Sequence, residues 1–142
     1  MVIAYRLRRR SGDVTVCAIT AGLHRLPDYS DTKITATLEY KRRLFSAVYS
    51  LDKIHASLNG TPPGLSKRYC DVRPFLDLED IFLPQEELAL AVQNLGPNGW
   101  NKSKEMRQIT VLRALSLLSP IREDILELSL GVCVTVSAGQ IE

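Results

Sequence analysis

The sequence is poor in the residues from which catalytic, metal and disulfide sites are built. Its 142 residues include two histidines, one tryptophan and three widely spaced cysteines, Cys17, Cys70 and Cys133. An odd number of scattered cysteines does not form a disulfide framework, which favours a reducing compartment. No apolar run approaches the roughly 20 residues that a membrane-spanning helix needs. The length and composition therefore predict one globular domain, residues 1–142, in the cytoplasm or nucleus, with peripheral membrane association as a further option.

Motifs for catalysis or cofactor binding are also missing. The one acidic cluster, at Asp77, Glu79 and Asp80, fits a solvated turn better than a calcium loop, which needs more oxygen ligands in a set order. Cys70 lies near arginines that would lower a thiol pKa, but no histidine partner can be identified for it. His55 falls on an apolar helical stripe, where a core histidine is expected. The sequence therefore predicts a non-enzymatic protein with no cofactor, no metal and no small-molecule substrate.

Alternating hydrophobicity predicts strands near both ends of the chain. The first two strands are separated by turn-forming residues at Arg10-Ser11-Gly12-Asp13, which predicts a hairpin. The last strand shows the longest alternation, with one face wholly aliphatic. The four predicted strands span residues 2–8, 14–20, 33–40 and 126–136.

Helical spacing takes over in the middle of the chain. Leu44, Leu51 and Leu58 belong to an apolar stripe that also holds His55, and the stripe stops at Asn59-Gly60. Further stripes predict helices over residues 85–95 and 102–118, closed by glycine or proline. We therefore expect an α+β fold, a mostly antiparallel sheet of about four strands with about three helices packed on one face. The other face of the sheet would be free to bind a partner.

Positive charge is concentrated in the first half of the chain. Residues 1–70 carry a net charge of +7 and residues 71–142 a net charge of −5. Such an asymmetry indicates an anionic partner, since guanidinium groups are well suited to phosphates. The basic residues expected to contact phosphates are Arg6, Arg8, Arg9, Arg10, Lys41, Arg42, Arg43, Lys67 and Arg68.

Two aromatic residues lie beside these or other cations. Trp100 sits in a glycine-rich loop and is followed by Lys102 and Lys104, while Tyr69 follows Lys67 and Arg68. Aromatic side chains next to cations can stack on bases or insert at a lipid interface. Burial of Trp100 in the core is the alternative. The sequence predicts stacking or membrane insertion by Trp100 and Tyr69.

The order of elements resembles the core of small matrix proteins from negative-strand RNA viruses. The likeness rests on the predicted strand at 33–40, the helix start Arg43-Leu44-Phe45, the loop at 60–64, the basic-aromatic residues at 67–69 and the late aliphatic strand. It implies a non-enzymatic structural protein that self-associates and joins ribonucleoprotein to a membrane. No individual residue role follows from it.

Two functional hypotheses follow. The first is an RNA-binding, self-assembling domain, possibly matrix-like and homo-oligomeric, which engages single-stranded RNA or an anionic membrane through its basic half. The alternative is a protein–protein interaction module that binds an acidic partner or self-associates head-to-tail, without nucleic acid. The opposite net charges of the two halves favour the alternative as much as the first hypothesis.

Overall fold

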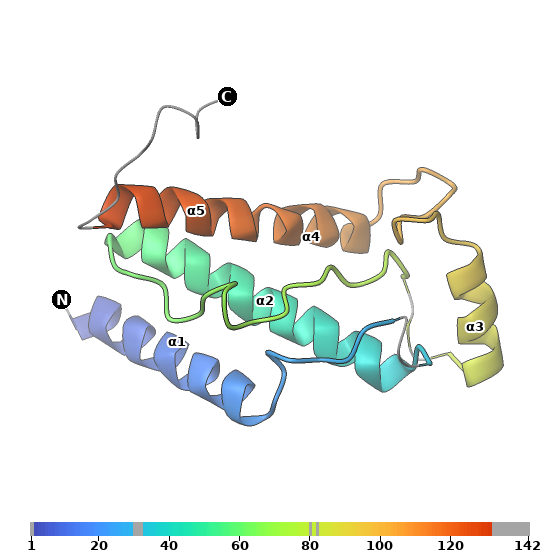
Figure 1. Ribbon diagram of the computed structural model, residues 1–142, viewed down its shortest axis with the longest axis horizontal. Helices are drawn as coiled ribbons and strands as arrows, with labels where there is room; N and C mark the ends of the chain where they lie inside the picture. Colours follow the sequence, from blue (N-terminus) through green and yellow to red (C-terminus); the bar gives the residue numbers. More distant parts are fainter. Residues whose placement is uncertain (1, 30–32, 80, 82, 132–142) are drawn as a thin grey trace.

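The computed structural model of the chain is built from helices (Figure 1). It describes residues 2–29, 33–79, 81 and 83–131, and within those residues there is no strand, only an isolated bridge between Leu95 and Asn101. The predicted α+β fold with a four-stranded sheet is therefore wrong. The helices are α1 (Val2–Thr20), α2 (Ala36–Asn59), α3 (Gln85–Gln93), α4 (Gln108–Leu117) and α5 (Ser119–Leu130).

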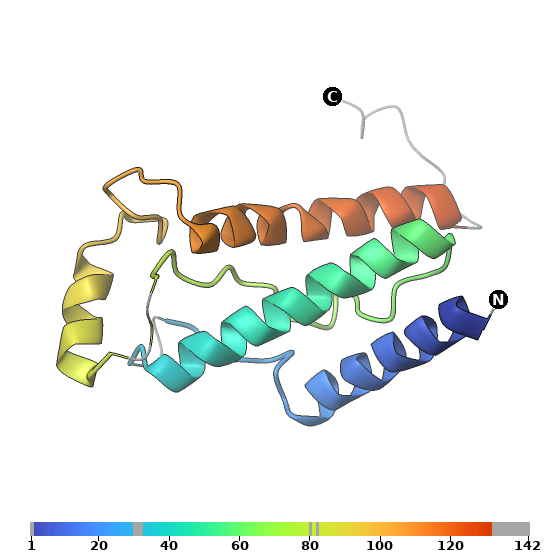
Figure 2. The same cartoon turned by 180° about the vertical axis from the view of Figure 1, so that it is seen from behind.

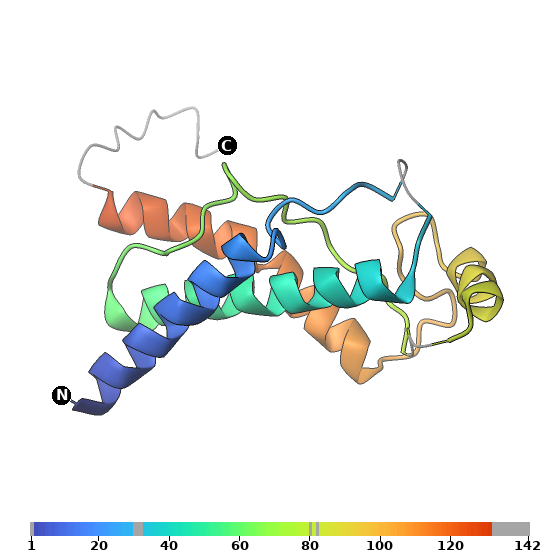
Figure 3. The ribbon, with the colours of Figure 1, turned by 90° about the horizontal axis from the view of Figure 1, so that it is seen from below.

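Helix α2 is the centre of the arrangement. Helix α1 lies along one side of it, and α4 and α5 follow one another along the other side (Figure 1). The extended chain between α2 and α3 crosses one face of α2, and Figure 2 shows α2 from behind, in front of that chain. Seen from below, the crossing chain stays on one side of α2 (Figure 3). One face of α2 is thus covered by the protein's own chain, while the opposite face is not.

The predicted hairpin at residues 2–20 is wrong, because α1 runs without a break through the expected turn. Within α1, the Thr15 hydroxyl donates to the carbonyl of Ser11 at 3.0 Å. Thr15 and Ala18 are buried, and their separation of three residues is a helical spacing that a strand would not bring to one face. Gly12 lies inside the helix at a cost of roughly 1 kcal/mol relative to alanine. A short segment can fit the period of a strand and the period of a helix equally well. Packing against α2 selects the helix here.

The predicted strand at 33–40 is wrong for a different reason. Thr35 is the N-cap of α2, and its hydroxyl accepts from the amide of Leu38 at 3.2 Å. The helix therefore starts at Ala36, inside the predicted strand. Gly60 ends it in the left-handed conformation, at φ 60°, as the sequence predicted. The threonine cap was the local signal that marked the helix start.

At the other end of the chain, the predicted strand at 126–136 is wrong where it can be compared. Leu126 to Leu130 complete α5, and residues 132–136 lie outside the described part of the chain. Helix α3 coincides closely with the predicted helix at 85–95. The predicted helix at 102–118 begins only at Gln108, because Lys104 takes a positive φ of 57°.

Two apolar clusters make up the described core. The first joins α1, α2 and the chain after α2 through Ala18, Phe45, Tyr49 and Leu65. The second lies near α3 and consists of Leu76, Leu78, Ile81, Leu88 and Leu95. Both clusters lie on the covered side of α2, so the uncovered side adds nothing to them.

Candidate functional site

The basic residues expected to form one patch lie in separate parts of the molecule. Arg6, Arg8, Arg9 and Arg10 all belong to α1, where spacings of three and four residues place Arg6, Arg9 and Arg10 on one side of the helix. Arg6, Arg9 and Arg10 are exposed. The start of α2, with exposed Lys41, lies at the opposite end of the molecule from the start of α1 (Figure 1).

Arg42 and Arg43 hold the chain together instead of facing solvent. Arg42 is 3% exposed, lies 4.1 Å from the centre of the Tyr29 ring and donates to the carbonyl of Pro27. Arg43 donates to the carbonyl of Leu78 and is 3.8 Å from Glu39. Both guanidinium groups therefore fix extended segments against α2.

Lys67 and Arg68 attach the chain after α2 to helix α5. The Lys67 ammonium bonds to Asp124, and Arg68 is 3.3 Å from Glu127. The backbone amide of Lys67 donates to the buried carboxylate of Glu123 at 2.9 Å. Both ion pairs are exposed and contribute little, typically below 1 kcal/mol each, but they occupy the two cations.

Trp100 is half-buried beneath an arginine. The guanidinium of Arg113 lies 4.5 Å from the centre of the Trp100 ring and donates to the carbonyls of Phe75, Gly99 and Asn98. Burial lowers the pKa of Arg113, and nearby Asp77 opposes that shift. A Trp100 ring held in this way supports its own loop. Tyr69, by contrast, is 72% exposed.

A buried ionic cluster joins α2, α5 and the chain between α2 and α3. The Lys53 ammonium is fully buried, 2.8 Å from Asp52 and 3.2 Å from Glu123, and donates to the carbonyl of Leu65. Burial raises the pKa of Glu123, but bonds from the Tyr49 hydroxyl and the Lys67 amide, together with Lys53, lower that pKa below its usual value. This cluster is complete within the molecule and leaves no donor for a ligand.

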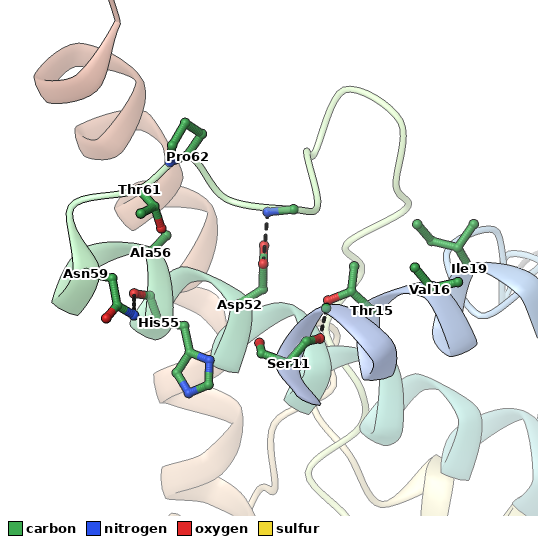
Figure 4. Close-up of a pocket in the computed structure, with 12 residues that line it drawn as sticks. Ser11, Thr15, Val16, Ile19, Asp52, His55, Ala56, Asn59, Thr61 and Pro62 are labelled. Atoms are coloured by element: carbon green, nitrogen blue, oxygen red, sulfur yellow. Dashed lines mark hydrogen bonds between the residues drawn. The ribbon is translucent and has the colours of Figure 1, made fainter. Parts of the chain in front are cut away.

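A cavity of about 340 Å³ opens between α1 and α2 (Figure 4). Ser11 and Thr15 line it from α1, and His55 and Asn59 line it from α2. Their hydrogen bonds are local: Asn59 donates to the carbonyl of His55, and Asp52 accepts from the amides that follow Pro63. None of the buried unpaired polar atoms recorded for the described residues lines this cavity. Its chemistry does not select a ligand class.

An apolar concavity with a volume of about 540 Å³ lies between α2 and α4. Leu51 and Ile54 line it from α2, Leu112 and Leu115 line it from α4, and Phe75 lies between the two helices. Leu51, Leu112 and Leu115 are each more than half exposed. We call this concavity the α2–α4 groove. Several leucines that are each about half exposed in one concavity are characteristic of an interaction surface.

The exposed apolar surface continues along the outer side of α4 and α5. The buried positions of α4 are Thr110, Arg113 and Ser116, whereas its leucines, Leu112, Leu115 and Leu117, are exposed. The exposed apolar residues of this outer face are Val111, Leu117, Leu118, Ile121, Ile125 and Leu128.

The described residues contain no group of three or more histidine, cysteine, aspartate or glutamate side chains placed to hold a metal ion. No helix formed by them has the length and hydrophobicity to span a membrane.

Comparison with protein families gives one match. Residues 7–128 match the model of the fungal specific transcription factor domain. The chain belongs to this family. A search of curated proteins and a search of solved structures each found no significant match to this transcription factor domain.

Family membership corrects the functional prediction. The resemblance to viral matrix proteins is wrong, and the predicted matrix-like structural role is wrong with it. The element order that suggested it included a strand at 33–40, where the structure has the start of α2. A transcription factor domain is a nuclear or cytoplasmic module, which agrees with the predicted location.

The α2–α4 groove was not predicted from the sequence, although Leu51, which lines it, belongs to a predicted apolar stripe. Leu44, Leu51 and Leu58 were assigned to an apolar stripe that would face the core, yet all three are exposed. The usable signal was their spacing of seven residues, which indicates a seam between helices. In the transcription factor domain this seam lies on the uncovered face of α2.

Proposed function

We propose that this chain is a non-enzymatic regulatory module of a fungal transcription factor. In this proposal it acts through contacts with other proteins and does not itself bind DNA. The family match supports the regulatory setting. The observation that carries the choice of protein contacts is the uncovered apolar surface of α2, α4 and α5. Affinity for DNA depends on many cations contacting phosphates, whereas this surface offers mainly leucine and isoleucine.

The disposition of charge supports the same proposal. Arg42, Arg113 and Lys53 are buried, and Lys67 and Arg68 bond to acids of α5. The three buried cations hold the fold and are not available to phosphates, whereas Lys67 and Arg68 would have to exchange exposed ion pairs for phosphate contacts. Binding of single-stranded RNA or an anionic membrane by the predicted basic residues stays an untested prediction.

The experiment compares a reporter readout with direct DNA binding. The chain is fused to an unrelated DNA-binding domain, and reporter output is measured for wild type and for Ile125→Asp/Leu128→Asp on α5, both positions being more than half exposed. We expect the fusion to change reporter output and the double variant to lose that change. The matched control is Leu90→Asp on α3, which is 61% exposed and lies away from this surface. An effect that survives in the α5 double variant would contradict the proposal.

A second candidate, direct contact with DNA phosphates, is favoured by the exposed Arg6, Arg9 and Arg10 of α1. Fluorescence anisotropy of labelled duplex DNA tests it. Under our proposal the isolated chain binds duplex DNA weakly, with no sequence preference and with loss of binding at physiological salt. Sequence-dependent binding that disappears in the Arg6→Ala/Arg9→Ala/Arg10→Ala variant would establish the second candidate instead.

A further inference from the structure

Arginine precedes a serine or threonine by three positions at four places in the sequence. The four hydroxyl residues are Ser11, Ser46, Thr110 and Ser116. Protein kinases that select basic substrates hold an arginine at this position with carboxylates beside their active site, and this pairing fixes the hydroxyl against ATP. The spacing therefore gives four candidate sites of phosphorylation, and the fold decides among them.

The fold removes three of the four sites. Ser46 lies in α2 with 7% of its surface exposed, and Thr110 and Ser116 lie in α4 with 9% and 8% exposed. A kinase must enclose the hydroxyl and its neighbours within its own active site, which a buried position of a packed helix does not permit. Ser11 of α1 is partly exposed and is the one of the four that is not buried.

The arginines before Ser11 are open to recognition. Ser11 follows three consecutive arginines, Arg8 to Arg10. Arg9 and Arg10 are exposed, and none of the ion pairs formed among the described residues involves either of them. The arginines that precede the three buried hydroxyls bond instead to carbonyl or carboxylate groups of the protein. Ser11 thus combines a reachable hydroxyl with neighbouring arginines that no described acid occupies.

The first half of α1 is weakly held, which gives a kinase access to the backbone around Ser11. Of the α1 side chains that the structure describes before Thr15, none is buried. Gly12 weakens the helix, since glycine loses more backbone freedom on folding than alanine does. The first turn of α1 has no acid to complement the helix dipole. Local opening of this half therefore presents Ser11 in an extended segment without unfolding the core.

In the closed helix, Ser11 faces acidic surroundings on α2. It lines the cavity between α1 and α2 together with Asp52 and His55 (Figure 4). Asp52 belongs to the buried ionic cluster, in which the carboxylates of Asp52 and Glu123 outnumber the single ammonium of Lys53. A phosphate would add a charge of about −1.5 to −2 beside this cluster, and His55 can supply at most one positive charge against it. In the open form the phosphate keeps its neighbouring arginines and moves away from the acids.

We infer that Ser11 is the acceptor site of an arginine-directed protein kinase, and that its phosphorylation releases the first half of α1 from α2. In the reaction the Ser11 Oγ attacks the γ-phosphorus of ATP and forms a new O–P bond. The bond from that phosphorus to the β,γ-bridging oxygen breaks, ADP leaves, and the hydroxyl proton passes to the catalytic aspartate of the kinase. The inference goes beyond the proposed function, because it concerns covalent control of α1 and needs no particular partner on the apolar surface.

The first experiment maps phosphate on the folded full chain. An arginine-directed serine kinase and Mg-ATP are the reagents, and mass spectrometry locates the phosphate and gives the initial rate. We expect phosphate on Ser11, and we expect Arg8→Ala/Arg9→Ala to lower the rate by about tenfold or more, because it removes the charges that a kinase cleft reads. Arg6→Ala is the matched control, since it removes an exposed arginine of the same helix, five positions before the hydroxyl, and should leave the rate within about twofold.

Two synthetic peptides separate the effect of the sequence from that of the fold. They span residues 4–16 and 40–51, so that each contains one hydroxyl with an arginine three positions before it, Ser11 or Ser46. Both peptides should accept phosphate, whereas in the folded chain Ser11 should accept it and buried Ser46 should not. The same double substitution in the first peptide tests the arginines independently of folding.

The second experiment measures the release of α1. Hydrogen exchange of the backbone amides compares the phosphorylated with the unmodified chain. We expect residues 6–14 to exchange at least about fivefold faster after phosphorylation, while the centre of α2 and α4 stays unchanged. Ser11→Asp should show a smaller change in the same direction, and Ser11→Asn, which has the same shape without the charge, is its matched control.

Three results would overturn the inference. Phosphate on another residue of the folded chain, or equal rates for wild type and Arg8→Ala/Arg9→Ala in both chain and peptide, would remove Ser11 as the arginine-directed site. Equal exchange of residues 6–14 with and without phosphate would remove the release of α1. Each of these leaves the reporter result on α5 untouched, so failure here is distinct from failure of the proposed function.

Discussion

The two sides of α2 reverse the usual distribution of polar and apolar residues. The covered side holds buried Glu39, Arg42, Asp52 and Lys53, whereas the uncovered side holds exposed Leu44, Leu51 and Leu58. In a solitary globular protein the charged residues would face water and the leucines the core. The difference indicates that the covered side needs no other protein, because its polar groups have partners within this chain. The uncovered side is the one to which our proposal assigns the contact with another protein.

The first prediction tests the covered side of α2 by removing its central cation, Lys53. Lys53→Ala should reduce the free energy of unfolding by about 3–5 kcal/mol, because it leaves the carboxylates of Asp52 and Glu123 without their shared cation in the interior. Urea denaturation monitored by circular dichroism measures the loss. Lys41→Ala, on the uncovered flank of the same helix, is the matched control and should change stability by less than about 0.5 kcal/mol. Equal effects of the two variants would mean that the buried cluster does not hold α2 and α5 together.

The second variant addresses the other buried cation. Arg113→Met should cost about 2–3 kcal/mol, because the carbonyls of Phe75 and Asn98 lose the guanidinium that donates to them, while the Gly99 carbonyl keeps the amide of Asp77. Trp100, the single tryptophan, lies against this guanidinium, so its fluorescence maximum should shift to longer wavelength as the loop loosens. Arg107→Met is the control, since Arg107 pairs with Glu105 at the surface. An unchanged emission spectrum in Arg113→Met would contradict the support that we assign to Arg113.

The third prediction uses pH to separate two carboxyl groups of the covered side. The pKa of Glu123 is lowered in the fold, so its ionised form stabilises the protein, and this contribution is lost as the pH falls below the ordinary value of 4.5. The pKa of Glu39 is raised, chiefly by burial and against the hydrogen bonds from Tyr29 and Leu76. Its contribution has the opposite sign: it is complete below the ordinary value of 4.5 and is lost as the pH rises through the raised pKa.

Urea denaturation at pH 7 and at pH 4 therefore distinguishes the two residues. Glu123→Gln should lose more stability relative to wild type at pH 7 than at pH 4. Glu39→Gln should lose more at pH 4 than at pH 7. Parallel pH dependences of the two variants would show that the carboxylates do not differ in their environments as the structure implies.

The positions of some helices could be predicted from the sequence, but the way in which they pack could not. The stop at Gly60 and the position of α3 could be predicted, because glycine and proline act locally. The sheet was wrong because residues 2–8, 14–20 and 33–40 alternate over too few residues to exclude a helix. Packing against α2 decided the outcome for the first two segments, and the Thr35 cap decided it for the third. The burial of Arg42 and Arg113 could not be predicted, since their carbonyl partners lie 14 to 38 residues away in the sequence.

The last prediction compares one variant on each side of α2, and the variant on the uncovered side should have the smaller effect on stability. Leu51→Ser on the uncovered side should change the free energy of unfolding by no more than about 0.5 kcal/mol, because a half-exposed leucine buries little apolar area in this chain. Phe45→Ala on the covered side, which is 3% exposed, should cost about 3–5 kcal/mol. Urea denaturation of the two variants compares them directly. If Leu51→Ser were as costly as Phe45→Ala, the seam would be part of this chain's own core, and its leucines would no longer indicate a partner.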